Sequence, residues 1–230
     1  MQERPSDSEL EAVRQIDTCT VTDAIAALKV RLRNEGYSDG SIRCMFERPV
    51  PMLGYAVTGR IRSAEPPVMG RRFVERGDWL RYLLTIPEPR VVVLQDADTK
   101  PGRGAFWDEV HVRIHLRLGC VGAITNGSVR DLANTRPMGF HLYAGSICAA
   151  QGYAHIIDMG GPVEVGGLMV NPCDLIHGDM HGFVLIPREV VADLPMASAK
   201  ALKGRERVAE LCESPDFSLE KLKALFRELD

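Results

Sequence analysis

The sequence predicts an α/β fold with helices at both ends of the chain. Two short runs, 90–95 and 121–125, are apolar enough to be buried strands, and the segment between them has apolar residues at helical spacing. A strand, a helix and a second strand in this order form a βαβ unit, whose strands are parallel. We expect one α/β domain over residues 1–230, with N-terminal helices in 1–35, a sheet core in 54–187 and C-terminal helices in 189–230.

The individual elements follow from caps, breakers and periodicity. Ser6 or Ser8 can cap a first helix that runs through Ile16, and a second helix is predicted over 24–33. Glycine and proline make 36–51 irregular. The other predicted elements are a strand at 54–62, a helix at 78–85, a strand at 90–95, a helix at 106–118, a strand at 121–125, β-like runs at 139–143, 155–158, 163–165 and 182–187, and helices at 189–211 and 218–229.

The composition is that of a globular protein, with 45% hydrophobic and 26% charged residues. The net charge of −3, without a basic run, offers no electrostatic surface for nucleic acid, so no nucleic-acid partner is expected. No apolar stretch is long enough to cross a bilayer, and the polar N-terminus does not resemble a signal peptide. The six cysteines form no CxxC pair and are expected to be reduced thiols. These features predict a cytoplasmic protein without a membrane partner.

The candidate site begins where the second buried strand gives way to the run 125–131, Thr-Asn-Gly-Ser-Val-Arg-Asp. An isolated Arg-Asp pair is more often a surface ion pair that caps a helix. Here the predicted helix start at 106–111 offers free backbone N–H groups for a carboxylate, which the fork of Arg130 could complete. Asp131 and Glu109 offer the hard oxygen ligands that Mg²⁺ or Mn²⁺ prefers. Such a cation beside a bound 2-oxo acid could stabilise an enolate without a lysine Schiff base.

Several segments in order carry a resemblance to a known family. They are Gly104–Val110, Leu118–Asp131, Gly145 with the turn Pro162–Gly167, and Val170–Pro187. On these motifs the chain resembles the family of 4-hydroxy-4-methyl-2-oxoglutarate aldolases, which also contains the regulator of ribonuclease activity A. The resemblance implies a β/β/α swivelling-type sandwich domain with helical terminal segments, assembled as a trimer or a dimer of trimers. It also implies a class II aldolase that releases pyruvate or decarboxylates oxaloacetate.

The resemblance also assigns roles to residues. Arg130 would bind the carboxylate of the 2-oxo acid substrate, and Asp131 would be the direct ligand of the divalent metal, Mg²⁺ or Mn²⁺. Glu109 would hold metal-bound water, and so would Glu206 from a neighbouring subunit. The oxo acid would be cradled by the backbone of Asp108, Glu109, Val110 and His111.

Two residues depart from the family pattern. Asp108 and Cys173 both stand where the family usually has glycine. The aspartate adds bulk and a second negative charge beside an anion, so it would either strengthen metal binding or repel substrate. Cys173 is expected to adjust a turn.

Three functions remain open at this point. The first is a metal-dependent lyase that cleaves a 4-hydroxy-4-substituted 2-oxo acid or decarboxylates oxaloacetate. The second is a non-catalytic binding protein similar to the ribonuclease regulator, and the third is an enzyme acting on another enolisable acid. A zinc site at the histidine pairs 111/115 or 177/181 is disfavoured, because neither pair has a nearby cysteine and the second falls in a predicted glycine-broken turn.

Overall fold

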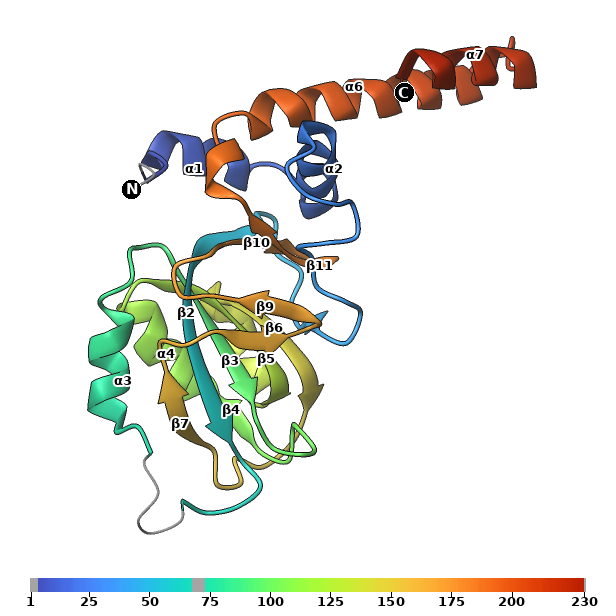
Figure 1. Ribbon diagram of the computed structural model, residues 1–230. Coiled ribbons are helices and arrows are strands. Elements are labelled where there is room, and N and C mark those ends of the chain that lie inside the picture. Colours follow the sequence, from blue (N-terminus) through green and yellow to red (C-terminus); the bar gives the residue numbers. More distant parts are fainter. Residues whose placement is uncertain (1–3, 68–72, 230) are drawn as a thin grey trace.

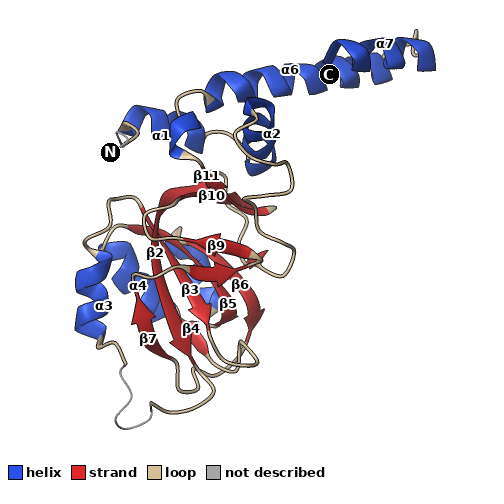
Figure 2. Ribbon diagram, in the orientation of Figure 1, coloured by secondary structure: helices blue, strands red, loops and turns tan. Residues whose placement is uncertain are grey.

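A computed structural model describes residues 4–67 and 73–229 (Figures 1 and 2), and it confirms a mixed α/β fold with helices at both ends. The helices are α1 (Asp7–Arg14), α2 (Thr18–Leu28), α3 (Arg76–Leu83), α4 (Glu109–Arg117), α5 (Leu132–Thr135), α6 (Leu194–Glu213) and α7 (Leu219–Leu229), with 3₁₀ turns η1 (Arg136–Met138) and η2 (Arg188–Val190). The strands are β1 (Arg43–Cys44), β2 (Met52–Arg62), β3 (Arg90–Asp96), β4 (Ala105–Trp107), β5 (Cys120–Val129), β6 (His141–Ile147), β7 (His155–Met159), β8 (Val163–Val165), β9 (Leu168–Val170), β10 (Leu175–Asp179) and β11 (Gly182–Ile186).

The main sheet has the strand order β1-β6-β5-β3-β2-β10-β11, with β4 beside β5 and β7 beside β2. Its centre is parallel, because β2 pairs with β3, β3 with β5, and β5 with β6 in the same direction. The predicted βαβ unit is therefore confirmed as β3, α4 and β5. As a result, the carboxyl ends of the central strands meet at one edge, where α/β structures commonly bind ligands.

The two faces of the main sheet carry separate cores. On one face Val92 packs in a cluster with Leu83 of α3 and Val112 of α4, while on the other Val91 packs with residues of the β8–β9 pair such as Val165. Neighbouring residues on a strand point to opposite faces, so the all-apolar run in β3 serves both cores. The layers are thus a two-stranded sheet, the main sheet and a layer of helices.

The N-terminal helices confirm one predicted boundary and correct another. Ser6 caps α1 with a capping box that includes Glu9, as expected. The predicted helix over 24–33 is wrong at both ends, because α2 begins after Asp17, whose side chain accepts a hydrogen bond from the Thr20 backbone. The helix ends where Lys29 turns left-handed, at φ 55°.

Three further predicted boundaries are wrong. The helix expected from Phe106 begins only at Glu109, because Phe106 and Trp107 extend β4 alongside β5. The strand expected to end at 125 continues to Val129. The C-terminal helix expected from Glu189 begins at Leu194, with a proline in its first turn, where a missing N–H costs no helical hydrogen bond.

The region of the second histidine pair contains a strand that the sequence did not suggest. His177 lies in β10, which is hydrogen-bonded between β2 and β11, whereas Met180 and His181 form the turn before β11. The expected glycine-broken turn is therefore confirmed for His181 and wrong for His177. His177 is fully buried, with Nδ1 3.0 Å from the Thr18 hydroxyl, whereas His181 is exposed. The small strand β9 was also missed.

Cys173 occupies a turn of the kind expected for it. Pro172 and Cys173 are the central residues of the turn Asn171–Asp174, in which the Asp174 backbone donates to the Asn171 carbonyl. Cys173 has a φ of 67°, the conformation that a type II turn requires at its third position and that glycine adopts most readily.

The C-terminal helices α6 and α7 extend from the end of the molecule where α1 and α2 lie (Figure 1). α6 packs on α2, and α7 folds back on α6. Ser218 accepts a hydrogen bond from the Lys221 backbone, as the cap predicted for α7 requires. Within the described residues, none of the helices combines the length and the apolar character that a membrane span needs.

Candidate functional site

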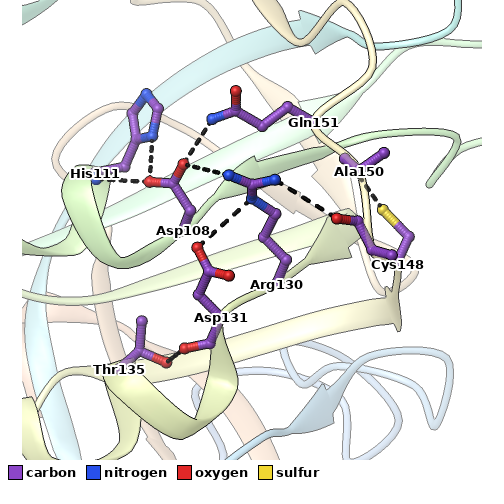
Figure 3. A network of polar contacts seen from close by, with 9 residues as sticks. Asp108, His111, Arg130, Asp131, Thr135, Cys148, Ala150 and Gln151 are labelled. Atoms are coloured by element: carbon purple, nitrogen blue, oxygen red, sulfur yellow. Dashed lines mark hydrogen bonds and ion pairs between the residues drawn. The ribbon is translucent and has the colours of Figure 1, made fainter.

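The candidate site forms where β4 and β5 end side by side. The Arg130 backbone N–H donates to the Trp107 carbonyl at 3.0 Å, which fixes the two strand ends to each other. Asp108 follows β4 as the N-cap of α4, and Asp131 follows Arg130 at the start of α5. The parallel pairing therefore brings together residues from the two motifs that the sequence singled out (Figure 3).

Asp108 is the most firmly held of these side chains and is only 4% exposed. Its Oδ1 accepts from the His111 backbone at 2.9 Å and lies 2.8 Å from His111 Nδ1, while its Oδ2 accepts from the Gln151 side chain at 2.6 Å. Burial acts to raise the pKa of Asp108, but the hydrogen bonds from His111 and the charge of Arg130 outweigh it, so the pKa lies below its usual value. Asp108 is therefore a permanent carboxylate near neutral pH.

Arg130 lies between two carboxylates without a close hydrogen bond to either. Its Nη2 is 3.6 Å from Asp108 Oδ2, and its Nε is 3.6 Å from Asp131 Oδ2. Nη1 reaches the Ala149 carbonyl at 3.5 Å, and Nε is buried without a hydrogen-bond partner among the described residues. The side chain is 30% exposed. The guanidinium thus keeps N–H groups that a ligand's carboxylate can use.

Asp131 presents its carboxylate toward solvent. Its backbone is left-handed, at φ 54°, a conformation that aspartate tolerates better than most residues. Its carbonyl accepts from the Thr135 backbone at 3.0 Å, which starts α5, while its side chain remains 40% exposed. The carboxylate is consequently accessible beside Arg130.

The donor set fits a magnesium-type cation better than zinc. In residues 4–67 and 73–229, no three His, Cys, Asp or Glu side chains converge to hold a metal. Mg²⁺ commonly keeps several waters and takes only one or two carboxylates from the protein, whereas structural zinc needs four close N or S ligands. The accessible carboxylate of Asp131 therefore fits a hydrated Mg²⁺ or Mn²⁺.

Three of the predicted site residues have side chains that take no part in this cluster within one chain. The Glu109 carboxylate binds Arg113, with Oε1 2.9 and 2.7 Å from two guanidinium nitrogens. Val110 is on the exposed side of α4. Glu206 lies in α6, at the end of the molecule opposite to the one toward which β2 and β3 point (Figure 1). The structure thus brings together Asp108, His111, Arg130 and Asp131.

Gln151 belongs to the cluster and was missed in the sequence. It comes from the loop after β6, the strand that pairs parallel to β5, and its amide donates to Asp108. Gln151 could have been found from the rule that the carboxyl ends of neighbouring parallel strands meet at the same edge of a sheet. The loop after β6 should therefore have been included in the candidate site.

The first turn of α4 is anchored to the core by His115. His115 Nε2 accepts from the Trp79 indole at 3.1 Å, and Nδ1 donates to the His111 carbonyl at 2.7 Å. Burial lowers the pKa of His115 to about 4, so the ring is neutral near pH 7. Since both ring nitrogens are engaged, His115 is not available as a zinc ligand.

Gly104 lets the Gln151 loop approach the site closely, and Gly104→Ala should destabilise the protein. A Cβ at Gly104 would lie 2.1 Å from the Gln151 carbonyl oxygen, so the loop would have to move. We expect a loss of about 2 kcal/mol in the free energy of unfolding, typical of overpacking. Urea denaturation would measure it. At Gly161 an added Cβ has open space among the described atoms, so Gly161→Ala is the control, and equal losses would contradict the steric argument.

A family model described as RraA-like, Aldolase/RraA, matches residues 18–185. The chain belongs to this RraA-like family. Within it, the chain is 30% identical over 118 residues to a "Putative 4-hydroxy-4-methyl-2-oxoglutarate aldolase" of Halalkalibacterium halodurans, covering 50% of this chain and 56% of that protein. It is 23% identical over 110 residues to "Protein DlpA" of Legionella pneumophila, covering 47% of this chain and 18% of that one. The chain thus spans about half or less of the length of these curated relatives.

Solved structures share the fold at low sequence identity. An uncharacterized protein from Pseudomonas syringae has a TM-score of 0.72 at 18% identity, with 97% of this chain and 96% of that chain covered. Streptomyces coelicolor RraAS2, described as an unusual member of the RNase ES inhibitor RraA protein family, has a TM-score of 0.67 at 18% identity, with 91% and 99% covered. The RraA-like family thus includes both putative aldolases and ribonuclease inhibitors.

Proposed function

We propose that this protein is a metal-dependent lyase that cleaves a 4-hydroxy-4-substituted 2-oxo acid to pyruvate and a second oxo compound, or decarboxylates oxaloacetate. In the cleavage, the bond between C3 and C4 breaks, the hydroxyl group on C4 loses its proton and becomes a carbonyl, and C3 gains a proton. The aldolase name of the relative in Halalkalibacterium halodurans supports this reaction class. We also propose that the fold is of the β/β/α swivelling type and that the protein is cytoplasmic.

The observation that carries the proposal is the state of Arg130. Its guanidinium lies 3.6 Å from each of two carboxylates, and Nη1 and Nη2 make only long contacts of 3.5 and 3.6 Å, which leaves their N–H groups to a ligand. In the first turn of α4 the backbone N–H groups of Glu109 and Val110 have no intrahelical acceptor. A carboxylate bound by Arg130 would thus meet a second set of donors, which orients a small 2-oxo acid at the strand ends.

A divalent cation is part of this proposal, and Asp131 would hold it. Such a cation would supply a Lewis acid that polarises the 2-oxo group and stabilises the negative charge formed as the C–C bond breaks. Arg130 would orient the substrate carboxylate. Glu109 would hold metal-bound water only if its carboxylate contacts that water while it also binds Arg113.

Glu206 would act from a neighbouring subunit. In one chain α6 extends away from the strand ends that form the site, so Glu206 could reach such a site only on another copy (Figure 1). The proposal therefore includes a homo-oligomer, a trimer or a dimer of trimers. Light scattering on the purified protein tests this part, and a strict monomer would remove Glu206 from the site.

A second candidate function is a non-catalytic regulator that binds a partner protein. The observation that favours it is Asp108, which already occupies one helix amide and engages Arg130. A protein that binds only a partner has no need for an accessible carboxylate beside a guanidinium with free N–H groups, which is why we place the lyase first.

Asp131→Ala tests the proposed function. With Mg²⁺ and 4-hydroxy-4-methyl-2-oxoglutarate or oxaloacetate, pyruvate release should fall at least about tenfold, because a carboxylate proposed to hold the cation is lost. A coupled lactate dehydrogenase assay measures the release. Asp158→Ala, an exposed aspartate on β7, is the matched control. Equal pyruvate release from wild type and Asp131→Ala would refute the site.

A further inference from the structure

Asp108 holds its carboxylate in the way that proteins hold a carboxylate ligand. Oδ1 accepts from a backbone amide in the first turn of a helix, Oδ2 accepts from the Gln151 side chain, and Arg130 lies 3.6 Å from Oδ2. Helix amides, side-chain amides and guanidinium groups are the usual donors to carboxylate ligands. Since Asp108 is almost fully buried, its negative charge is a fixed part of the site (Figure 3).

His111 holds Asp108 in place and does not line the space beside Asp131. Its backbone N–H and its Nδ1 both contact Asp108 Oδ1, on the side of the carboxylate away from Arg130 (Figure 3). Its ring also packs on Phe106, with centroids 4.7 Å apart. These contacts fix the position of the Asp108 charge, so a ligand bound at Arg130 cannot displace it easily.

Two carboxylates, those of Asp108 and Asp131, lie on either side of the single guanidinium of Arg130. The Glu109 carboxylate is paired with Arg113 instead. A ligand bound at Arg130 therefore lies close to the fixed negative charge of Asp108. Like charges in a partly buried site repel, so Asp108 opposes a ligand with two negative charges more than a ligand with one.

We infer that the buried Asp108 carboxylate tunes the ligand charge that this site prefers, by weakening the binding of 2-oxo acids with two negative charges relative to those with one. The inference rests on the proposed function and narrows its substrate class. It assigns Asp108 a role in specificity through its charge.

Asp108→Asn isolates the charge, because asparagine keeps the shape and can still accept at Oδ1 as an N-cap. Binding of pyruvate, with one negative charge, and of oxalate, with two, is measured by calorimetry with Mg²⁺ and again without metal. The ratio of oxalate to pyruvate affinity should rise about tenfold from wild type to variant. Comparing ratios removes the intrinsic difference between the two ligands.

Two further proteins complete the experiment. Asp108→Ser is a second neutral N-cap that should raise the same ratio, and it replaces Asp108→Asn if that variant does not fold. Asp216→Asn removes a charge from a side chain that is 84% exposed between α6 and α7, and it should leave the ratio unchanged. Thermal unfolding of each variant shows whether the fold is intact.

The outcomes separate the inference from the proposed function. If both ligands bind but the ratio is the same in wild type and in the Asp108 variants, Asp108 does not set the preferred charge, while the proposed site stands. If neither ligand binds to wild type or to any variant, with or without Mg²⁺, the proposed function fails and the inference fails with it. A tenfold rise confined to the Asp108 variants supports both.

Discussion

Arg130→Ala should lower kcat/KM for pyruvate release about a thousandfold while changing the melting temperature little. Two charge-assisted hydrogen bonds from one guanidinium to a carboxylate are each worth roughly 1.5–3 kcal/mol, and about 4 kcal/mol corresponds to a thousandfold in rate. The stability effect is small because Arg130 is 30% exposed and its two ion pairs are both 3.6 Å long. Steady-state kinetics and a thermal melt on the same protein measure both effects.

Two other substitutions serve as comparisons for Arg130→Ala. Arg130→Lys keeps the positive charge but not the planar fork, so it should recover only part of the activity. Arg113→Ala removes a guanidinium from the same surface, where Arg113 binds Glu109, and should affect kcat/KM far less. Activity in Arg130→Ala within threefold of wild type would mean that Arg130 does not bind the substrate carboxylate.

The central sheet could be predicted because its strands carry an unambiguous pattern. The run Val91–Val93 is buried on both faces of the sheet, and only a parallel strand with layers on both sides accommodates such a run. β10 could not be predicted in the same way, because it contains His177 and Gly178 and lacks a continuous apolar run. Its place in the sheet depends on partners far away in the sequence, β2 and β11, and on Thr18, which covers His177.

The end of β5 shows why local patterns fail at a functional edge. The dipeptide Asn126–Gly127 is typical of a turn, yet the strand continues through it. Asn126 makes this possible by accepting from the Asp96 backbone N–H at 2.7 Å and donating to the Asp96 carbonyl at 3.1 Å. The side chain thereby continues the contacts between β5 and β3 beyond Thr125, the last β5 residue whose backbone pairs with β3. Such long-range side-chain contacts have no signature in a single sequence.

The members of the candidate site were predictable to different degrees. Arg130 and Asp131 lie in a motif, and the βαβ pattern put Asp108 at the same sheet edge. The Glu109 carboxylate can either face the site or bind Arg113 one helical turn away, and the sequence does not decide between the two. Gln151 was not found because loops are placed by the strands that precede them, and the β-like run predicted at 139–143 ends four residues before β6 does, at Ile147.

Mild acid should destabilise the protein strongly, because three histidines are buried in the neutral form. Burial lowers the pKa of His115, of His141 and of His177 from 6.5 to about 4. The unfolded chain takes up these protons near pH 6.5 but the folded protein only near pH 4. The stability is therefore complete above pH 6.5 and is lost as the pH falls from 6.5 toward 4, by up to roughly 3 kcal/mol per histidine. Three such losses are comparable to the total stability of a typical domain.

His141→Leu isolates one of these contributions. Leucine is close to histidine in size and does not titrate, whereas substituting His115 or His177 would leave the Trp79 indole or the Thr18 hydroxyl without its partner. Besides burial, the nearby charges of Arg48 and Arg14 keep His141 neutral, and leucine has no charge for them to act on. Between pH 7 and pH 5, urea denaturation should show wild type losing about 2 kcal/mol more than this variant. His155→Leu, at a partly exposed position on β7, is the control for replacing a histidine by leucine as such. A pH dependence in His141→Leu equal to that of wild type would show that His141 does not couple folding to proton uptake.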